Sequence, residues 1–318
     1  MLVVDFDKKV ITADNHCLET YRTCEEKYRL GLHEHWRPTS GTVPLAFGIA
    51  MHAGRAKFKQ YMMTDVEKKV AVEEAVIHGL KVWDSEMPAE MKTEVMVDDK
   101  RGRKNFERLA RGYLEKYGGP EFQPVQVEVP GKQFLGTTPE GWTFNYVYII
   151  DEIVKHRDKL YPLEFKTNGE MWPPNDVWFS QFHTRASITG YIWACEKHFG
   201  YDIGGAIIHA MWVHAEPKPG SKSKYTLPDY FKMDYTYRDD KQIEEWKQTT
   251  LLTGDDIVRS VREGRWKKNL GYSCNLFGGC DFKKVCGATP GVRPALLEMD
   301  FEKSEWNPWA RNDSGSGS

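Results

Sequence analysis

The chain has 318 residues, of which 28% are charged and 40% are hydrophobic, and its formal net charge is −2. This composition excludes a largely disordered chain and allows a sizeable core in one large or two modest domains. Near-neutrality also excludes attraction of the whole molecule to nucleic acid, so binding of that kind must rely on local basic patches. Two candidate patches lie at residues 100–111 and 265–268.

The amino-terminal stretch MLVVDFDKKVIT contains acidic residues and no long apolar run, so we expect no signal peptide. No window approaches the ~20 apolar residues of a membrane span, and we expect no membrane partner. We therefore expect a cytoplasmic protein. In a reducing compartment, clustered cysteines bind metal more often than they form disulfides.

The predicted elements change in type along the chain. Helical spacing of apolar residues predicts helices at 12–30 (capped by Asp14 or Asn15), 45–62, 64–84 and 103–117. Strand patterns follow at 124–130, 144–154 and 159–166, with a turn at Arg157 and Asp158 between the last two. A helix at 181–198, a strand at 206–214 and a helix at 240–264 complete the order, and beyond Gly287 periodicity is lost up to a flexible SGSGS tail. This order predicts a mixed α/β core with a helical amino-terminal elaboration.

Two carboxylates and a lysine lie on consecutive predicted strands. Asp151 is on the first strand, and Glu164 and Lys166 are on the next. Residues two apart on a strand share a face, and a hairpin of the two strands can bring Asp151 to the same end of the sheet. Carboxylates are the hard oxygen ligands that Mg²⁺ and Mn²⁺ prefer, and a lysine can stabilise charge on a phosphate. The pattern predicts phosphodiester hydrolysis, with a surface salt-bridge ladder as the alternative.

Two further side chains are candidates for the same site. Gly48 and His52 are four residues apart on one face of a predicted helix, where glycine permits close approach and imidazole can ligate a metal. A structural or exposed histidine is the alternative. Glu128, on the preceding predicted strand, could also point into the site.

Four cysteines predict a second site. Cys274, Cys280 and Cys286 are separated by five residues each, and Cys24 lies near the start of the chain. Zinc sites typically use paired spacings of two to four residues, whereas wider gaps suit an iron–sulfur cubane, although spacing alone leaves zinc open. Cys17 and Cys195 are interpreted as bystanders, with Cys17 as a possible substitute ligand because it lies two helical turns before Cys24.

Taken together, these segments resemble RecB-type nucleases of the PD-(D/E)XK superfamily. The resemblance is strongest to the iron–sulfur branch, which includes AddB, the CRISPR-associated Cas-four type proteins and their phage-borne relatives. It spans roughly residues 12–290 and is carried by residues 21–28 around Cys24, 48–52, 150–167 and 274–286.

The resemblance implies a restriction-endonuclease-like core sheet flanked by helices, and a cysteine-cluster staple that joins the two termini. His52, Asp151, Glu164 and the Phe165 carbonyl would hold Mg²⁺ or Mn²⁺, and Lys166 would be the catalytic lysine. Cys24, Cys274, Cys280 and Cys286 would hold a [4Fe-4S] cluster. If the chain is phage-encoded, the compartment would be the host cytoplasm.

The resemblance also implies a division of one integrated domain into parts. These are a helical region with the first cluster cysteine at 1–120, the nuclease core at 121–240, a carboxy-terminal helix and cluster-binding segment at 241–290, and a tail at 291–318.

The sequence departs from the family pattern at two points. Tyr148 stands where relatives usually have glycine. Relatives also carry a glutamine four residues before a tyrosine that touches substrate; here Tyr191 is present, but Ser187 takes the glutamine's place. Gln181, with Arg185 four residues later, offers another register, so both Gln181 and Tyr191 are candidate substrate contacts.

These patterns lead to three functional hypotheses. We predict a metal-dependent exonuclease on single-stranded DNA or DNA ends, in which Trp172, Trp178 and Phe179 either stack on unpaired bases or belong to the core or a lid. The alternatives are a nucleic-acid-binding adaptor with a degenerate site, and an endonuclease within a larger recombination complex. The sequence contains no G-x-x-x-x-G-K-[ST] phosphate loop, so a helicase would be a separate partner.

Overall fold

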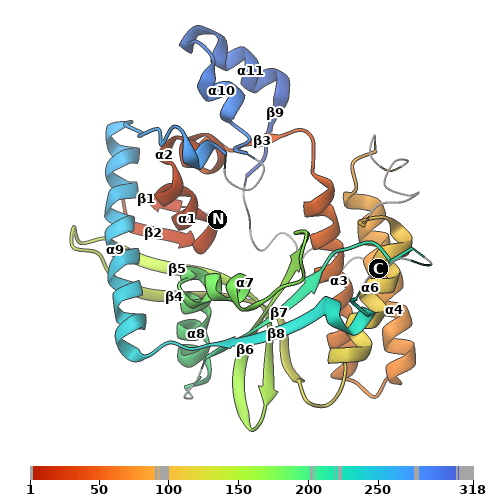
Figure 1. Cartoon of the computed structure of the whole chain (residues 1–318). Helices are drawn as coiled ribbons and strands as arrows, with labels where there is room; N and C mark the ends of the chain where they lie inside the picture. Colours follow the sequence, from red (N-terminus) through yellow and green to blue (C-terminus); the bar gives the residue numbers. More distant parts are fainter. Residues whose placement is uncertain are drawn as a thin grey trace. The chain divides into compact units, whose positions relative to one another are not determined.

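The computed structural model describes residues 3–89, 92, 100–200, 203, 205–218, 220, 224–275, 279–305 and 307. These residues form a mixed α/β fold in which strands are flanked by helices, as predicted (Figure 1). The chain divides into two compact units. Unit 1 comprises Met1–Thr39, Pro130–Ile149 and Asp240–Ser318, and unit 2 comprises Ser40–Val129 and Ile150–Asp239.

Unit 1 is assembled from both ends of the chain. Strand β1 pairs antiparallel with β2, and β2 pairs parallel with β5 (Thr143–His156), so that Ile11 lies opposite Phe144. Its described elements are β1 (Val3–Asp5), β2 (Val10–Asp14), α1 (Asn15–Thr23), α2 (Glu25–Tyr28), the π-helix Arg29–His33, β3 (Trp36–Pro38), α9 (Asp240–Glu263), the 3-10 turns Tyr272–Cys274 and Pro290–Val292, α10 (Lys283–Gly287), α11 (Arg293–Asp300) and β9 (Phe301–Lys303).

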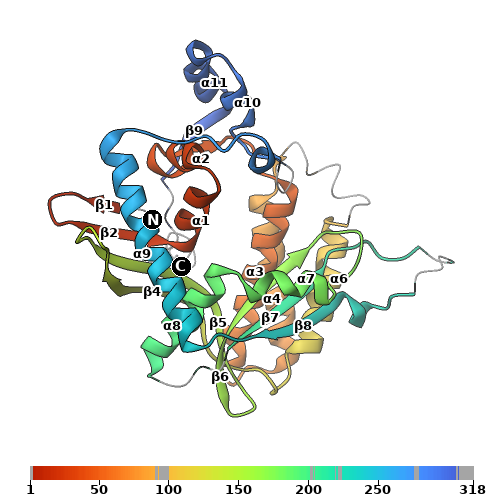
Figure 2. The same cartoon turned by 60° about the vertical axis from the view of Figure 1, so that its left-hand side comes forward.

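Helix α9 packs closely against the strands of unit 1. A Cβ atom placed on Gly254 would come within 2.9 Å of the Phe144 ring and 3.2 Å of Ile11. Glycine in a helix interior costs about 1 kcal/mol relative to alanine, but here it permits this close approach. Figure 2 shows α9 running past α1 and β2.

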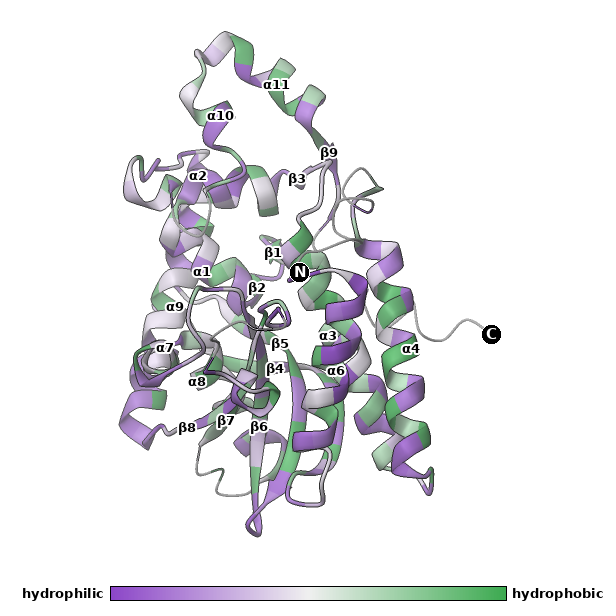
Figure 3. Ribbon diagram, turned by 45° about the vertical axis from the view of Figure 1, so that its right-hand side comes forward, coloured by the Kyte–Doolittle hydropathy of each residue, from purple (hydrophilic) through white to green (hydrophobic). Residues whose placement is uncertain are grey.

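Unit 2 contains three packed helices and most of the sheet. Helices α3 (Val43–Met62), α4 (Lys68–Glu86) and α6 (Arg103–Tyr117) contact one another, and α3 and α8 both contact β6. Figure 3 shows hydrophobic and hydrophilic residues alternating along α3, α4 and α6, as expected of helices with one buried face. The other described elements are β6 (Lys159–Asn168), α7 (Asp176–Ser180), the 3-10 turns Gln181–His183 and Leu227–Tyr230, α8 (Ala186–Phe199), β7 (Ala206–Trp212) and β8 (Phe231–Thr236).

Strands β4 (Gln123–Thr137) and β5 (Thr143–His156) contribute residues to both units. In unit 2, β5 pairs antiparallel with β6, β6 pairs parallel with β7, and β7 pairs antiparallel with β8. All residues of β7 are buried, as expected for a strand covered on both faces.

The hairpin that links β5 to β6 confirms the predicted turn. His156 pairs with Lys159, and the two residues between them have φ angles of 49° and 64°. Two consecutive positive φ angles are typical of the tight turn whose twist matches that of the flanking strands. Pro162 lies within β6, but the pairing of β6 with β7 begins only at Leu163, so the missing N–H of proline is tolerated there.

Several predicted bounds were wrong. The predicted helix 12–30 begins at Asn15, because residues 10–14 form β2, and it breaks at Cys24, whose backbone is extended. Asp14 does cap the helix, since its side chain accepts the Cys17 N–H at 2.8 Å. The predicted helix 181–198 is divided into a 3-10 turn at 181–183 and α8.

The carboxy-terminal region is more ordered than predicted. Helix α11 and strand β9 follow Gly287, and β9 pairs with β3, with Phe301 opposite Pro38. Phe301 stacks on Phe282 at 4.9 Å between ring centroids, which buries both rings. The SGSGS tail lies outside the described residues, and strands β1 and β8 were not predicted. The described helices include none with the length and apolar character of a membrane span.

Candidate active site and cysteine pocket

The β5–β6 hairpin brings the two predicted carboxylates together. The described antiparallel pairs end at Glu152 and Leu163. Next to this last pair, Asp151 Oδ2 of β5 accepts a hydrogen bond from the backbone N–H of Phe165 of β6 at 2.9 Å. A side chain therefore links the two strands where their backbone pairing stops. On β6, Glu164 and Lys166 form an ion pair, which confirms that their side chains lie on the same face of the strand. Asp151 and Glu164 are 15% and 7% exposed, whereas Lys166 is 34% exposed.

Helix α3 places basic groups against this hairpin. Nδ1 of His52 lies 3.4 Å from Asp151 Oδ2, and the His52 ring meets the Phe165 ring edge-on at 5.1 Å. Gly48, one turn earlier, lies close to β6, because a Cβ there would be 3.6 Å from Thr167 Oγ1. The helix face predicted from Gly48 and His52 therefore does point to the hairpin.

A buried ion cluster lies beside these groups. Nη1 of Arg55 donates to Glu152 Oε2 at 2.5 Å, and Nη2 lies 3.7 Å from Asp151 Oδ2. Lys59 Nζ lies 3.2 Å from Glu152 Oε1. Arg55, Lys59 and Glu152 are 2%, 3% and 0% exposed. Since an isolated buried charge is very costly, each member depends on the others.

The electrostatic balance keeps the central groups charged. Burial raises the pKa of Asp151, but His52, Arg55 and Lys166 outweigh this effect and hold that pKa below its usual value. Burial lowers the pKa of Lys166, but the charges of Glu164 and Asp151 raise it above its usual value. Glu128 is half-buried and has a φ angle of 49°, unusual for a non-glycine residue. Its charge contributes to a raised pKa of Arg55, which places Glu128 near this cluster.

The donor set at this site fits a hard divalent cation in its chemistry. The two carboxylates are the hard oxygen ligands that Mg²⁺ and Mn²⁺ prefer, and one imidazole is a softer ligand beside them. Within the part of the chain that the structure describes, no three His, Cys, Asp or Glu side chains are positioned to bind the same metal ion. Lys166 pairs with Glu164, and Asp151 Oδ2 accepts the Phe165 N–H with Arg55 Nη2 3.7 Å away.

The predicted substrate contacts lie on the segment after β6. Gln181 is exposed and donates to the Trp178 carbonyl within its own turn at 2.7 Å. Tyr191 is half-buried on α8, and Ser187, one turn earlier, is buried. Arg185 is near enough to Lys166 for its charge to oppose the rise in the lysine pKa. Gln181 and Tyr191 stay predictions as substrate contacts.

The three predicted aromatic residues divide into two groups. Phe179 is buried, and Trp178 packs on it and on Phe182 with ring centroids 5.0 and 5.1 Å away, so these two belong to the local core. Trp172 is 62% exposed. It lines an open groove together with Pro173, Pro174, Asn175, Tyr225, Asp229 and Lys232.

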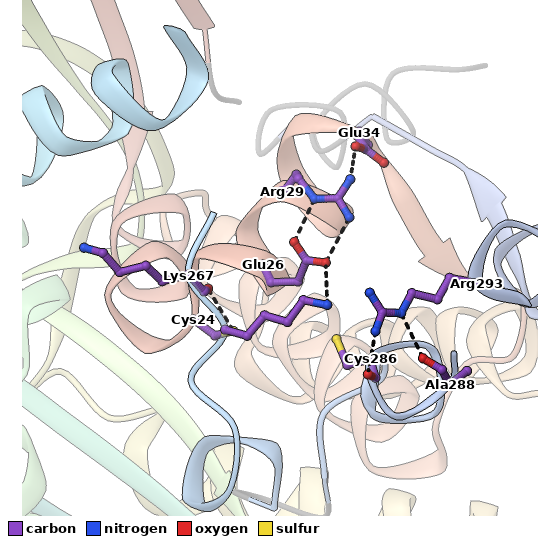
Figure 4. Close-up of polar contacts among 9 residues, drawn as sticks. Cys24, Glu26, Arg29, Glu34, Lys267, Cys286, Ala288 and Arg293 are labelled. Atoms are coloured by element: carbon purple, nitrogen blue, oxygen red, sulfur yellow. Dashed lines mark hydrogen bonds and ion pairs between the residues drawn. The ribbon is translucent and has the colours of Figure 1, made fainter. Parts of the chain in front are cut away.

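The four predicted cluster cysteines border a single pocket in unit 1. Cys24, Cys274, Cys280 and Cys286 all line it, and so do Lys27, Lys268 and Lys283. Each of the four thiols is free and partly exposed. Figure 4 shows Cys24 and Cys286 beside a polar network in which Glu26 accepts from Arg29 at 2.8 Å. Segments from both ends of the chain thus line one pocket, but among the described residues no three of these thiols are grouped closely enough to hold one ion.

The cysteine pocket is supported by a small apolar cluster. Leu30, Phe282, Val285, Leu297 and Phe301 form this cluster, against which Cys280 and Cys286 pack. Burial raises the pKa of both thiols. Cys17 and Cys195 are fully buried and do not line the pocket, as expected of core residues.

One comparison, with models of protein families, agrees with this arrangement. The family model of the PD-(D/E)XK nuclease superfamily matches residues 16–287. The chain belongs to the PD-(D/E)XK nuclease superfamily. Among solved structures, LHK-Exo in complex with dAMP is similar over 67% of this chain and 93% of that chain, with 14% identity and a TM-score of 0.28. No curated protein matches the chain.

In this PD-(D/E)XK chain, sequence reasoning missed three residues of the buried cluster, Arg55, Lys59 and Glu152. A signal was present, because His52, Arg55 and Lys59 recur at helical spacing on a helix that is otherwise rich in apolar residues. Basic residues on the buried face of a helix indicate a buried acid opposite them.

Proposed function

We propose that the chain is a Mg²⁺- or Mn²⁺-dependent deoxyribonuclease of the RecB-type iron–sulfur branch, acting as an exonuclease on single-stranded DNA or DNA ends. The observation that carries the proposal is the meeting of His52, Asp151, Glu164 and Lys166 at one hairpin and one helix of a PD-(D/E)XK fold. Metal identity, DNA specificity and the branch of the superfamily are parts of the proposal.

The residues have distinct roles in this proposal. Asp151, Glu164, His52 and the Phe165 carbonyl hold the divalent ion. When bound, the ion supplies Lewis-acid stabilisation of charge on the phosphoryl oxygens. Lys166 donates to the phosphate or orients the attacking water, so that developing charge meets a fixed cation. The Phe165 N–H donates to Asp151 Oδ2 and Arg55 Nη2 lies 3.7 Å from the same oxygen, and these groups would orient the carboxylate that would hold the ion.

The exonuclease proposal is tested by the topology of the substrate. We expect the purified protein with Mn²⁺ to degrade linear single-stranded DNA and to leave a circular single strand of the same sequence intact, because an exonuclease needs an end. Gel analysis of both substrates in one reaction gives the answer. Cutting of the circle at the rate of the linear strand would establish an endonuclease instead.

The groove at Trp172 is the proposed site for unpaired bases. Trp172 follows Lys166 by six residues, and Tyr225 and Lys232 offer a second ring and a cation. Base–aromatic stacking contributes about 1–3 kcal/mol per base. We expect Trp172→Ala to weaken binding of a single-stranded oligonucleotide by roughly 5- to 150-fold in fluorescence anisotropy with chelator present. Met171→Ala, a neighbouring exposed residue outside the groove lining, is the matched control; equal affinities of the two variants would refute the stacking role.

The cysteine pocket is the proposed site of a [4Fe-4S] cluster. Four thiols border one pocket, and their five-residue gaps are wider than the pairs typical of zinc sites. Lysines at the pocket offset the negative charge of a thiolate-ligated cluster. The cluster would join the segment after α1 to the segment after α9, so that its assembly contributes to folding.

Replacement of one cluster ligand tests this part of the proposal. We expect Cys280→Ala, purified without oxygen, to lose iron and brown colour and to become sensitive to protease. Cys195→Ala, at a buried cysteine in unit 2, is the control and should keep its iron, its brown colour and its resistance to protease. Visible absorption, iron and zinc analysis and limited proteolysis are the measurements. A stable and fully active Cys280→Ala protein, or zinc in the wild type, would rule out the cluster as the staple.

A further inference from the structure

Cations of the protein itself engage both carboxylates of the candidate metal site. Lys166 Nζ pairs with Glu164 Oε1, and Arg55 Nη2 lies 3.7 Å from Asp151 Oδ2. Oppositely charged groups at such separations attract strongly when partly buried. A divalent ion therefore competes with resident positive charge, and Glu164 becomes fully available to it only after Lys166 has moved.

The two resident cations differ in their freedom to move. Arg55 is 2% exposed and is held by Glu152, which Lys59 also contacts at 3.2 Å. Separating a buried charge from its partner costs several kcal/mol, so Arg55 stays where it is. Lys166 is 34% exposed and has a flexible four-carbon stem. Lys166 is thus the cation that can exchange partners.

We infer that the Lys166–Glu164 ion pair makes the binding of the divalent ion and the binding of a DNA phosphate depend on each other. A phosphate draws the ammonium group away from Glu164, and the freed carboxylate then accepts the ion. Conversely, an ion at Glu164 releases Lys166 to the phosphate. Linkage requires the same factor in both directions. The inference rests on the proposed function, because it takes both ligands from the nuclease site.

The coupling can be measured without turnover. Isothermal titration calorimetry of the whole chain with Mn²⁺ is done alone and with a saturating single-stranded phosphorothioate oligonucleotide that resists cleavage. We expect the oligonucleotide to lower the Kd for Mn²⁺ by about 5- to 150-fold, the range typical of coupled sites. An oligonucleotide of the same sequence with uncharged methylphosphonate linkages should leave the Kd unchanged, because it offers Lys166 no anion.

Two variants attribute the coupling to Lys166. We expect Lys166→Met to bind Mn²⁺ more tightly than the wild type without DNA and to gain much less from the phosphorothioate, because only the direct attraction between the ion and the phosphates remains. Lys155→Met removes a lysine of β5 that is 49% exposed and paired with Asp158, and it should keep the full coupling.

Equal Kd values for Mn²⁺ with and without the phosphorothioate would overturn the inference, and so would coupling in Lys166→Met that is as strong as in the wild type. If the wild type binds no Mn²⁺ under either condition, the inference and the proposed metal site fail together. Binding without coupling defeats the inference alone and leaves the proposed function in place.

Discussion

Asp151→Ala and Lys166→Ala are each expected to abolish Mg²⁺- or Mn²⁺-dependent DNA cleavage and to leave the fold intact. Asp151 is a proposed metal ligand, and Lys166 is the only side chain assigned to charge on the phosphate in the proposal. Loss of one preorganised electrostatic group typically costs about 10²–10³ in rate, and loss of a metal ligand removes the ion's contribution as well. Release of end label from single-stranded DNA measures the effect.

A matched control separates loss of charge in general from loss of these groups. Lys155→Ala removes a half-exposed lysine from the same hairpin and should cleave like the wild type. Circular dichroism and the visible spectrum of the three variants should be unchanged. If purified Asp151→Ala or Lys166→Ala protein cleaved DNA at the rate of the wild type, the catalytic assignment would be refuted.

Among the single substitutions proposed for this protein, Glu152→Ala is expected to cause the largest loss of folding free energy. Its side chain is fully buried and accepts from Arg55 at 2.5 Å and contacts Lys59 at 3.2 Å. Removing it leaves two buried cations without their shared anion, and breaking such a pair costs about 3–5 kcal/mol. Urea unfolding followed by circular dichroism measures the change in the free energy of unfolding.

The surface of the same hairpin provides the comparison for this prediction. Asp158 is 96% exposed and pairs with Lys155 at 3.2 Å. An exposed pair contributes little because water and salt screen it, so Lys155→Ala, which removes the same pair, should unfold at nearly the wild-type urea concentration. If Glu152→Ala were as stable as Lys155→Ala, the buried cluster would have no structural importance.

Local patterns predicted the elements whose signals lie within their own sequence. Helix α6 has the predicted bounds 103–117, because its apolar residues recur on one face and its other face is charged. The turn at Arg157 and Asp158 was predicted from the strands on either side. The ion pair between Glu164 and Lys166 follows from the two-residue period of a strand.

The features that were missed depend on distant partners. Residues 10–14 form a strand that pairs with β1, a segment of only three residues, and with residues 143–147, more than a hundred positions later. Strand β9 similarly depends on β3. Helical spacing does place Arg55 and Lys59 on one face of their helix, but it does not identify their shared partner Glu152, which lies 97 positions after Arg55 in the chain.

Metal-dependent cleavage is measured by digestion of end-labelled single-stranded DNA by the anaerobically purified wild type with Mn²⁺, with Mg²⁺, and with chelator added. We expect progressive shortening of the labelled strand with either ion and none with chelator. An intact strand under all three conditions, or shortening that chelator does not stop, would contradict a metal-dependent nuclease site at Asp151, Glu164 and Lys166.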